Sequence, residues 1–109
     1  MSKKFARILL AVLFSSALVF AQSEIGGATL NGVVTDPSSA VVAGAKITVR
    51  NAAIGLTRSM ETTNAGLYSF SRLPAGTYDL TVESPGFKTI AQKDIQLTVG
   101  AVVTMDTRL

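Results

Sequence analysis

The stretch that decides the fold is GLYSFSRLPAGTYDLTVESPGF, residues 66–87. Large apolar side chains recur at every second position on both sides of a Leu-Pro-Ala-Gly corner, first at Tyr68 and Phe70 and then at Tyr78 and Leu80. This spacing gives each segment one apolar face, which is typical of half-buried strands. A second turn, Ser-Pro-Gly, follows the second segment. The stretch therefore predicts two strands that each pack one face against a core.

The same alternation continues on both sides of this stretch. Strands are expected over residues 29–35, 45–51, 56–63, 67–71, 77–83, 87–92 with a continuation towards Gly100, and 102–109. The segment 56–63 is rich in threonine and charge, which indicates an edge strand. Seven short strands separated by turn residues, with no helical period between them, predict an all-β fold. The expected architecture is a seven-stranded antiparallel β-sandwich.

The first 21 residues have the composition of a secretory signal peptide. Three basic residues before position 8 precede a short apolar run, and the small side chain of Ala21 suits cleavage after that residue. A membrane-spanning helix would need roughly 20 apolar residues, and residues 8–21 form a shorter run with two serines inside it. A retained anchor is therefore the less favoured alternative. The expected organisation is a signal peptide at 1–21, a short leader at 22–28 and a domain at 29–109.

Charge and cysteine content restrict the partners of the domain. Three of the ten lysines and arginines lie in the signal segment, and the remaining seven equal the seven aspartates and glutamates, all of which follow residue 21. A neutral domain has no basic stripe for phosphates, so we expect no nucleic-acid partner. The chain has no cysteine, which excludes a disulfide framework and a thiolate metal site.

The residue types needed for catalysis are scarce. Histidine and cysteine are absent, which removes the commonest general base and the thiol nucleophile. Asp79 and Glu83 alternate with apolar residues and are expected to be solubilising charges. Asp36, Asn51 and Asn64 offer oxygen atoms to calcium, but side chains of this kind form turns more often. We expect a domain that is not an enzyme and that holds no cofactor and no metal.

Several segments resemble a known family. The quoted segments are LNGVVTD at 30–36, VAGAKITVRN at 42–51, GLYSF at 66–70, LPAGTY at 73–78 and PGFK at 85–88. Together they resemble the carboxypeptidase regulatory-like domain, whose fold is a transthyretin-like, carbohydrate-binding-like sandwich of immunoglobulin-like appearance. The closing segments IQLTVG and VTMDTRL are similar to the version that stands at the N-terminus of TonB-dependent, Oar-like outer-membrane receptors, behind a signal peptide.

The resemblance implies an accessory module in the periplasm or at the outer membrane, possessing a surface for a protein partner or for adjacent receptor domains. The edge segment 56–63 is the expected contact, with Arg58 and Glu61 on it and Phe87 as a further exposed residue. The alternative is that Arg58 and Glu61 guard this edge against pairing. Contact with a membrane is expected only through the signal peptide or a barrel further along a longer chain.

Carbohydrate binding is the alternative function that the resemblance implies. Sugars are commonly gripped by exposed aromatic rings, yet Tyr68, Phe70 and Tyr78 fall on inward positions, which leaves Phe87. Secretion as a free module is compatible with either function. A weaker third hypothesis is a stabilising subdomain of a hydrolase encoded elsewhere. The sequence leaves open whether Leu109 ends a free module or the front part of a receptor.

Overall fold

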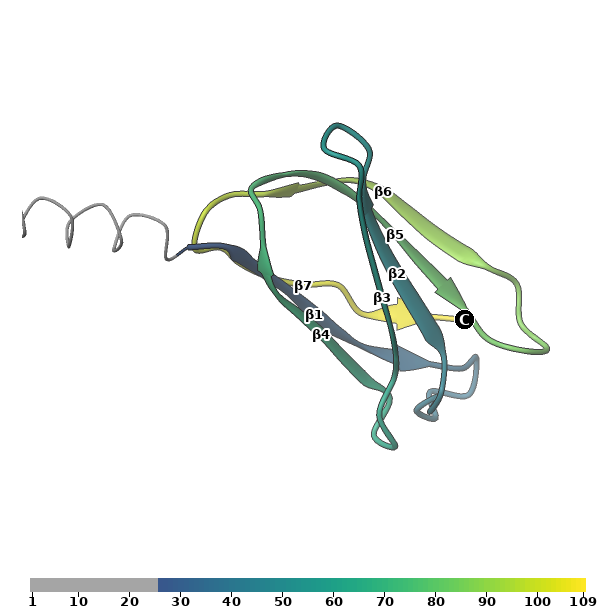
Figure 1. Cartoon of the computed structure of the whole chain (residues 1–109). Helices are drawn as coiled ribbons and strands as arrows, with labels where there is room; N and C mark the ends of the chain where they lie inside the picture. Colours follow the sequence, from purple (N-terminus) through teal and green to yellow (C-terminus); the bar gives the residue numbers. More distant parts are fainter. Residues whose placement is uncertain (1–25) are drawn as a thin grey trace, which may run out of the picture.

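The computed structural model describes residues 26–109, which form two sheets packed face to face (Figure 1). The expected signal peptide and most of the expected leader lie outside the described residues. Within 26–109, the structure has no helix that is long and apolar enough to cross a membrane. The all-β sandwich is confirmed.

Each of the two sheets contains four strands of the described residues. Sheet one contains β4 (Leu67–Leu73), β1 (Ala28–Thr35), β7 (Val102–Thr104) and β8 (Thr107–Arg108), in the order β4-β1-β7 with β8 also paired to β1. Sheet two contains β3 (Leu56–Glu61), β2 (Lys46–Asn51), β5 (Gly76–Glu83) and β6 (Ile90–Leu97), in the order β3-β2-β5-β6. All neighbours in sheet two are antiparallel, as is the pair of β1 and β4.

The core lies between the inner faces of the two sheets, as the alternation predicted. Its members are almost completely shielded from solvent, and the largest of those less than 2% exposed are Tyr78, Leu30, Ile47, Leu73 and Leu80. Burial of each such side chain stabilises the fold by about 1.5–3 kcal/mol. A threonine side chain ends the ladder between β2 and β3. Strand β3 stops before Thr62, because the Thr62 hydroxyl accepts from the Ala45 N–H and donates to the Val42 carbonyl.

The closing strand differs from the expectation in two respects. It is broken into β7 and β8, so the described residues contain eight strands, and both pieces run parallel to β1. The direction is parallel because the chain returns to the start of β1, where the Thr29 N–H donates to the Ala101 carbonyl over 2.8 Å. The break occurs at Asp106, because its carboxylate Oδ1 accepts from the Val33 N–H over 3.0 Å in place of a backbone carbonyl.

Strand β6 also differs from the expected segment. Phe87 belongs to the preceding turn, where its N–H donates to the Ser84 carbonyl, and the strand begins only at Ile90. It then continues without interruption to Leu97, past a bulge at which Asp94 has φ of 59°. The bulge absorbs the change of phase between the two apolar patterns, which is why they appear as separate segments in the sequence.

Candidate binding surfaces

Four strand edges bound the sandwich. Among the described residues, strand β3 pairs only with β2, so the prediction of an edge at this segment is confirmed. The opposite edge of sheet two is β6, and the edges of sheet one are β4 and the β7–β8 pair. An unpaired edge is a template for another strand unless side chains cover it. The four edges differ in this respect.

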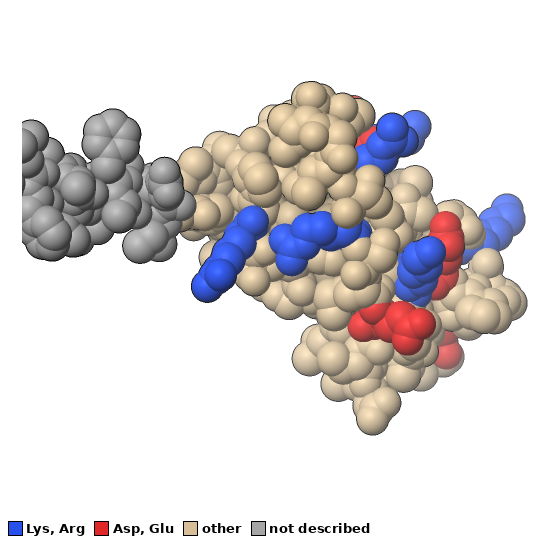
Figure 2. Space-filling view, in the orientation of Figure 1, with Lys and Arg blue, Asp and Glu red and all other residues tan. Residues whose placement is uncertain are grey.

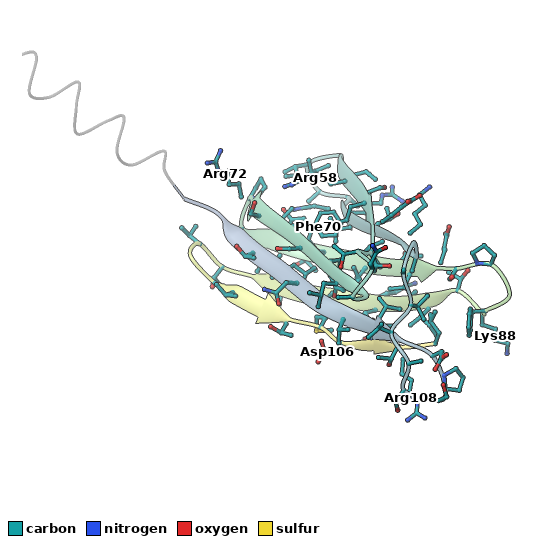
Figure 3. All side chains as sticks on the ribbon, turned by 90° about the horizontal axis from the view of Figure 1, so that it is seen from below. Arg58, Phe70, Arg72, Lys88, Asp106 and Arg108 are labelled. Carbon is teal, nitrogen blue, oxygen red and sulfur yellow. The ribbon has the colours of Figure 1, made fainter. Side chains whose placement is uncertain are left out.

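The free edge of β4 is covered by side chains from β3. The Arg58 guanidinium donates to the Ser71 carbonyl over 2.7 Å, and the Met60 sulfur accepts from the Ser69 N–H over 3.4 Å. Arg58 also lies 5.7 Å from the ring centroid of Phe70, which is on β4 like Ser69 and Ser71 (Figure 3). Arg58 therefore guards an edge, but the edge belongs to the neighbouring β4 and not to its own strand.

The edge of β6 is open. This strand has eight residues and no proline, and the side chains from Ala91 to Asp94 are exposed. Within residues 26–109, its backbone pairs only with β5. Lys93 and the bulge at Asp94 are devices that limit pairing with a stray strand.

The three residues expected to form a contact surface do not come together. Glu61 lies beside an open hollow of about 390 Å³ near the Ser84–Pro85 turn, where Lys46 faces Glu61 on one side and Glu83 on the other. Phe87 follows this turn and is 38% exposed. Arg58 lies well away from Lys88, the residue after Phe87 (Figure 3).

The aromatic rings do not form an exposed platform in the part of the chain that the structure describes. Tyr68, Phe70 and Tyr78 are at most 2% exposed, as predicted, so only Phe87 shows its ring to solvent. Both tyrosine hydroxyls bind backbone carbonyls: Tyr78 donates to Pro74 over 2.6 Å and Tyr68 donates to Met105. Burial, and to a lesser degree the nearby Asp106 charge, raises the pKa of Tyr68 to about 12.

Of the three residues that could have held calcium, Asp36 and Asn51 accept hydrogen bonds in turns, and Asn64 lies in the turn before β4. The Asp36 carboxylate accepts from the Ser38 hydroxyl and from the N–H groups of Ser38 and Ala40, which lowers the pKa of Asp36. Asn51 accepts from the Ala53 N–H. Among residues 26–109, no three acidic side chains gather into a cation site.

A second hollow, which the sequence did not reveal, lies on the outer face of sheet one. It has a volume of about 480 Å³, and Val33, Leu67 and Met60 supply its apolar part. Its polar residues include Asn31, Thr104 and Asp106. The signal available in the sequence was weak: Val33 and Leu67 each stand beside a core residue, in the outward phase of an alternating strand. Their meeting depends on the β1–β4 register, which pairs Val33 with Leu67.

One face of the domain carries few charged side chains. Figure 2 shows that most of the visible face is uncharged, and that acidic and basic side chains mix over its right-hand part. The fold and these surfaces define a small β-sandwich whose described residues offer edges and hollows for contact and no assembled reaction centre.

The comparisons identify its family. The carboxypeptidase regulatory-like domain matches residues 29–109, and the chain belongs to this family. No curated protein matches the chain.

Solved structures share the fold. The TIE protein of Bacillus anthracis superposes with a TM-score of 0.65 at 18% identity, over 76% of this chain and 16% of that chain. A candidate carbohydrate-binding protein of Bacteroides uniformis gives 0.60 at 24% identity, over 74% and 40%. A type II cohesin–X-dockerin complex of Acetivibrio cellulolyticus gives 0.59 at 23% identity, over 74% and 53%. The chain thus spans about half or less of these structures, and the likeness concerns the fold.

Proposed function

We propose that this domain is a non-enzymatic interaction module, exported to the periplasm or outer membrane, which contacts a protein through a strand edge. The partner is a separate protein or an adjacent domain of a TonB-dependent outer-membrane receptor. The main observation is the contrast between two edges: β3 side chains cover β4, whereas the outer backbone of β6 has no partner within residues 26–109. A partner strand added to such an edge gains backbone hydrogen bonds along its length.

The receptor part of the proposal is supported by the family and by the closing segments. The regulatory-like family matches the whole described domain apart from its first residues, and VTMDTRL at 103–109 resembles the receptor-associated version of it. In that arrangement the domain would stand between a signal peptide and the receptor proper.

Photo-crosslinking in the native cell tests the strand-edge contact. A photoreactive amino acid replaces exposed Gln92 on β6 in one strain and exposed Thr57 on β3 in another, and replaces Ile54 in the β2–β3 turn as the control. We expect a crosslinked product from the Gln92 position and none from Ile54. A product from Thr57 alone would move the contact to β3, and crosslinks from neither strand would contradict the edge proposal.

Membrane fractionation combined with intact mass tests the receptor part. An antibody against the domain is used on the product of the native locus. A product much larger than residues 22–109 in the outer membrane is expected. A product of the mass of residues 22–109 in the soluble periplasm would contradict the receptor link and leave the interaction function standing.

Carbohydrate binding is the second candidate, because Phe87 is exposed directly after the Ser84–Pro85 turn, whose residues line a hollow together with Lys46 and Glu61. One ring is a small platform, so this function predicts weak binding that depends on that ring. Glycan arrays probed with the wild-type protein and the Phe87→Ala variant decide the matter. Binding that the variant loses would favour this candidate, and absence of binding would exclude the arrayed sugars.

A further inference from the structure

The outer faces of the two sheets differ in charge. On sheet two, Lys46 lies directly between Glu61 and Glu83, and Arg50 stands opposite Asp79. Opposite charges in adjacent strands attract one another, so positive and negative side chains are balanced on this face. On sheet one, the outward positions of the central strand β1 carry no charge at all: they are Thr29, Asn31, Val33 and Thr35.

Exposed apolar residues concentrate on the side of sheet one. Leu67 on β4 is 50% exposed and Val102 on β7 is 70% exposed. Two connecting segments add Val41, beside Gly66 at the start of β4, and Val99, beside Gly26 at the start of β1. Scattered apolar residues are ordinary on a surface, but exposed apolar residues on and beside a face whose central strand has no outward charge indicate a contact.

The hollow on this face is lined mostly by apolar surface. Val33 and Leu67 are paired across the β1–β4 ladder and form its floor. Met60 on β3 also lines the hollow, and its sulfur accepts a hydrogen bond from the Ser69 N–H. The volume of about 480 Å³ falls within the range of about 300–1,000 Å³ that is usual for ligand sites.

One carboxylate stands at this hollow. Asp106 is exposed, and its Oδ1 accepts from the Val33 N–H, which leaves Oδ2 available at the surface (Figure 3). The cation closest to it in the sequence, Arg108, is used elsewhere and donates to the Pro37 carbonyl. A single negative charge beside an apolar hollow is complementary to an apolar residue followed or preceded by a cation.

We propose that the outer face of sheet one binds an extended peptide segment of a partner protein in which an apolar side chain, seated on Val33 and Leu67, stands next to a lysine or arginine that pairs with Asp106. This inference rests on the proposed interaction function and names the chemistry of a partner. It adds a second surface, separate from the β6 edge.

The test uses the exported protein and an array of immobilised twelve-residue peptides of random sequence. Asp106→Asn keeps an oxygen for the Val33 N–H but removes the charge, and Leu67→Glu places a charge in the apolar hollow. The matched controls are Glu83→Gln, another exposed acid, which lies on sheet two away from the β6 edge, and Ile54→Glu, another apolar residue that is about half exposed. Urea unfolding shows that each variant retains its fold.

We expect the wild-type protein to select peptides with an apolar residue beside a lysine or arginine. Leu67→Glu should weaken binding of the selected peptides at least about tenfold, which corresponds to about 1.4 kcal/mol. Asp106→Asn should abolish the preference for the basic neighbour while apolar selection persists. Both controls should bind as the wild-type protein does.

Other outcomes overturn the inference and remain separable from the proposed function. Peptide selection that both Asp106→Asn and Leu67→Glu leave unchanged would exclude this face, while crosslinks from Gln92 would still support the strand edge. Self-association that Leu67→Glu abolishes, seen by sedimentation without any peptide selection, would assign the face to a second copy of the chain. Loss of the Gln92 crosslink with selection intact would refute only the edge contact.

Discussion

Two buried threonines differ in what their hydroxyl groups bind. The Thr62 hydroxyl accepts from the Ala45 N–H over 2.9 Å and donates to the Val42 carbonyl over 2.7 Å, so it closes the end of the β2–β3 ladder. The Thr107 hydroxyl, on β8, has no hydrogen-bond partner among the described residues. A buried polar group costs free energy when it is unpaired and stabilises modestly when it is paired.

Replacement of each threonine by valine separates these two cases. Thr107→Val should leave the free energy of unfolding unchanged or raise it by about 1 kcal/mol, because it removes an unpaired hydroxyl at nearly constant shape. Thr62→Val should lower it by about 1–3 kcal/mol, because the Ala45 N–H and the Val42 carbonyl lose their partner. Urea unfolding of both variants measures the difference. Equal losses would show that Thr107 is paired in solution.

At the scale of elements, the closing strand depends on a close approach to β1. The Met105 carbonyl accepts from the Tyr68 hydroxyl and faces Gly32, where an added Cβ would lie only 2.1 Å from the Met105 oxygen. Glycine is required at this position by lack of space and not by its backbone angles. The same junction positions Asp106 to accept from the Val33 N–H.

Gly32→Ala should therefore displace the closing strand. We expect a loss of about 1–3 kcal/mol in the free energy of unfolding, which is typical of overpacking, and faster hydrogen exchange at the Leu109 amide, which donates to the Thr35 carbonyl. Gly26→Ala is the control, because its Cβ would meet only the movable Val99 side chain at 3.2 Å. Unchanged exchange at Leu109 in Gly32→Ala would show that β8 forms without this approach.

At the scale of the whole molecule, Tyr68 links stability to pH. Burial is the main reason that its pKa rises from 10.0 to about 12, with Asp106 contributing second. The folded state therefore keeps the phenol proton at pH values where the unfolded chain releases it. The stability that this proton provides is complete below pH 10 and is lost as the pH rises from 10 towards 12.

Urea unfolding at a series of alkaline pH values tests this linkage. The wild-type protein should lose stability faster than Tyr68→Phe as the pH rises above about 10. At neutral pH the variant should be less stable by about 1 kcal/mol, since the Met105 carbonyl loses its donor. Parallel pH profiles for the two proteins would contradict the raised pKa.

The sequence by itself determined the sandwich, its core and one of its edges. Period-two spacing places Tyr68, Phe70 and Tyr78 inside because a one-residue slip would expose every apolar side chain of a strand. The threonine-rich composition of 56–63 likewise marks β3 as an edge without any knowledge of its neighbours.

Tertiary structure alone decided the break in the closing strand, its parallel direction and the positions of the candidate surfaces. These depend on groups far apart in the chain: the Asp106 carboxylate replaces a carbonyl for Val33, Arg58 covers a strand other than its own, and Val33 meets Leu67 across the β1–β4 register. Local alternation specifies which face of a strand is apolar. It does not specify which strand lies beside it, and the hollow on sheet one exists only because of that pairing.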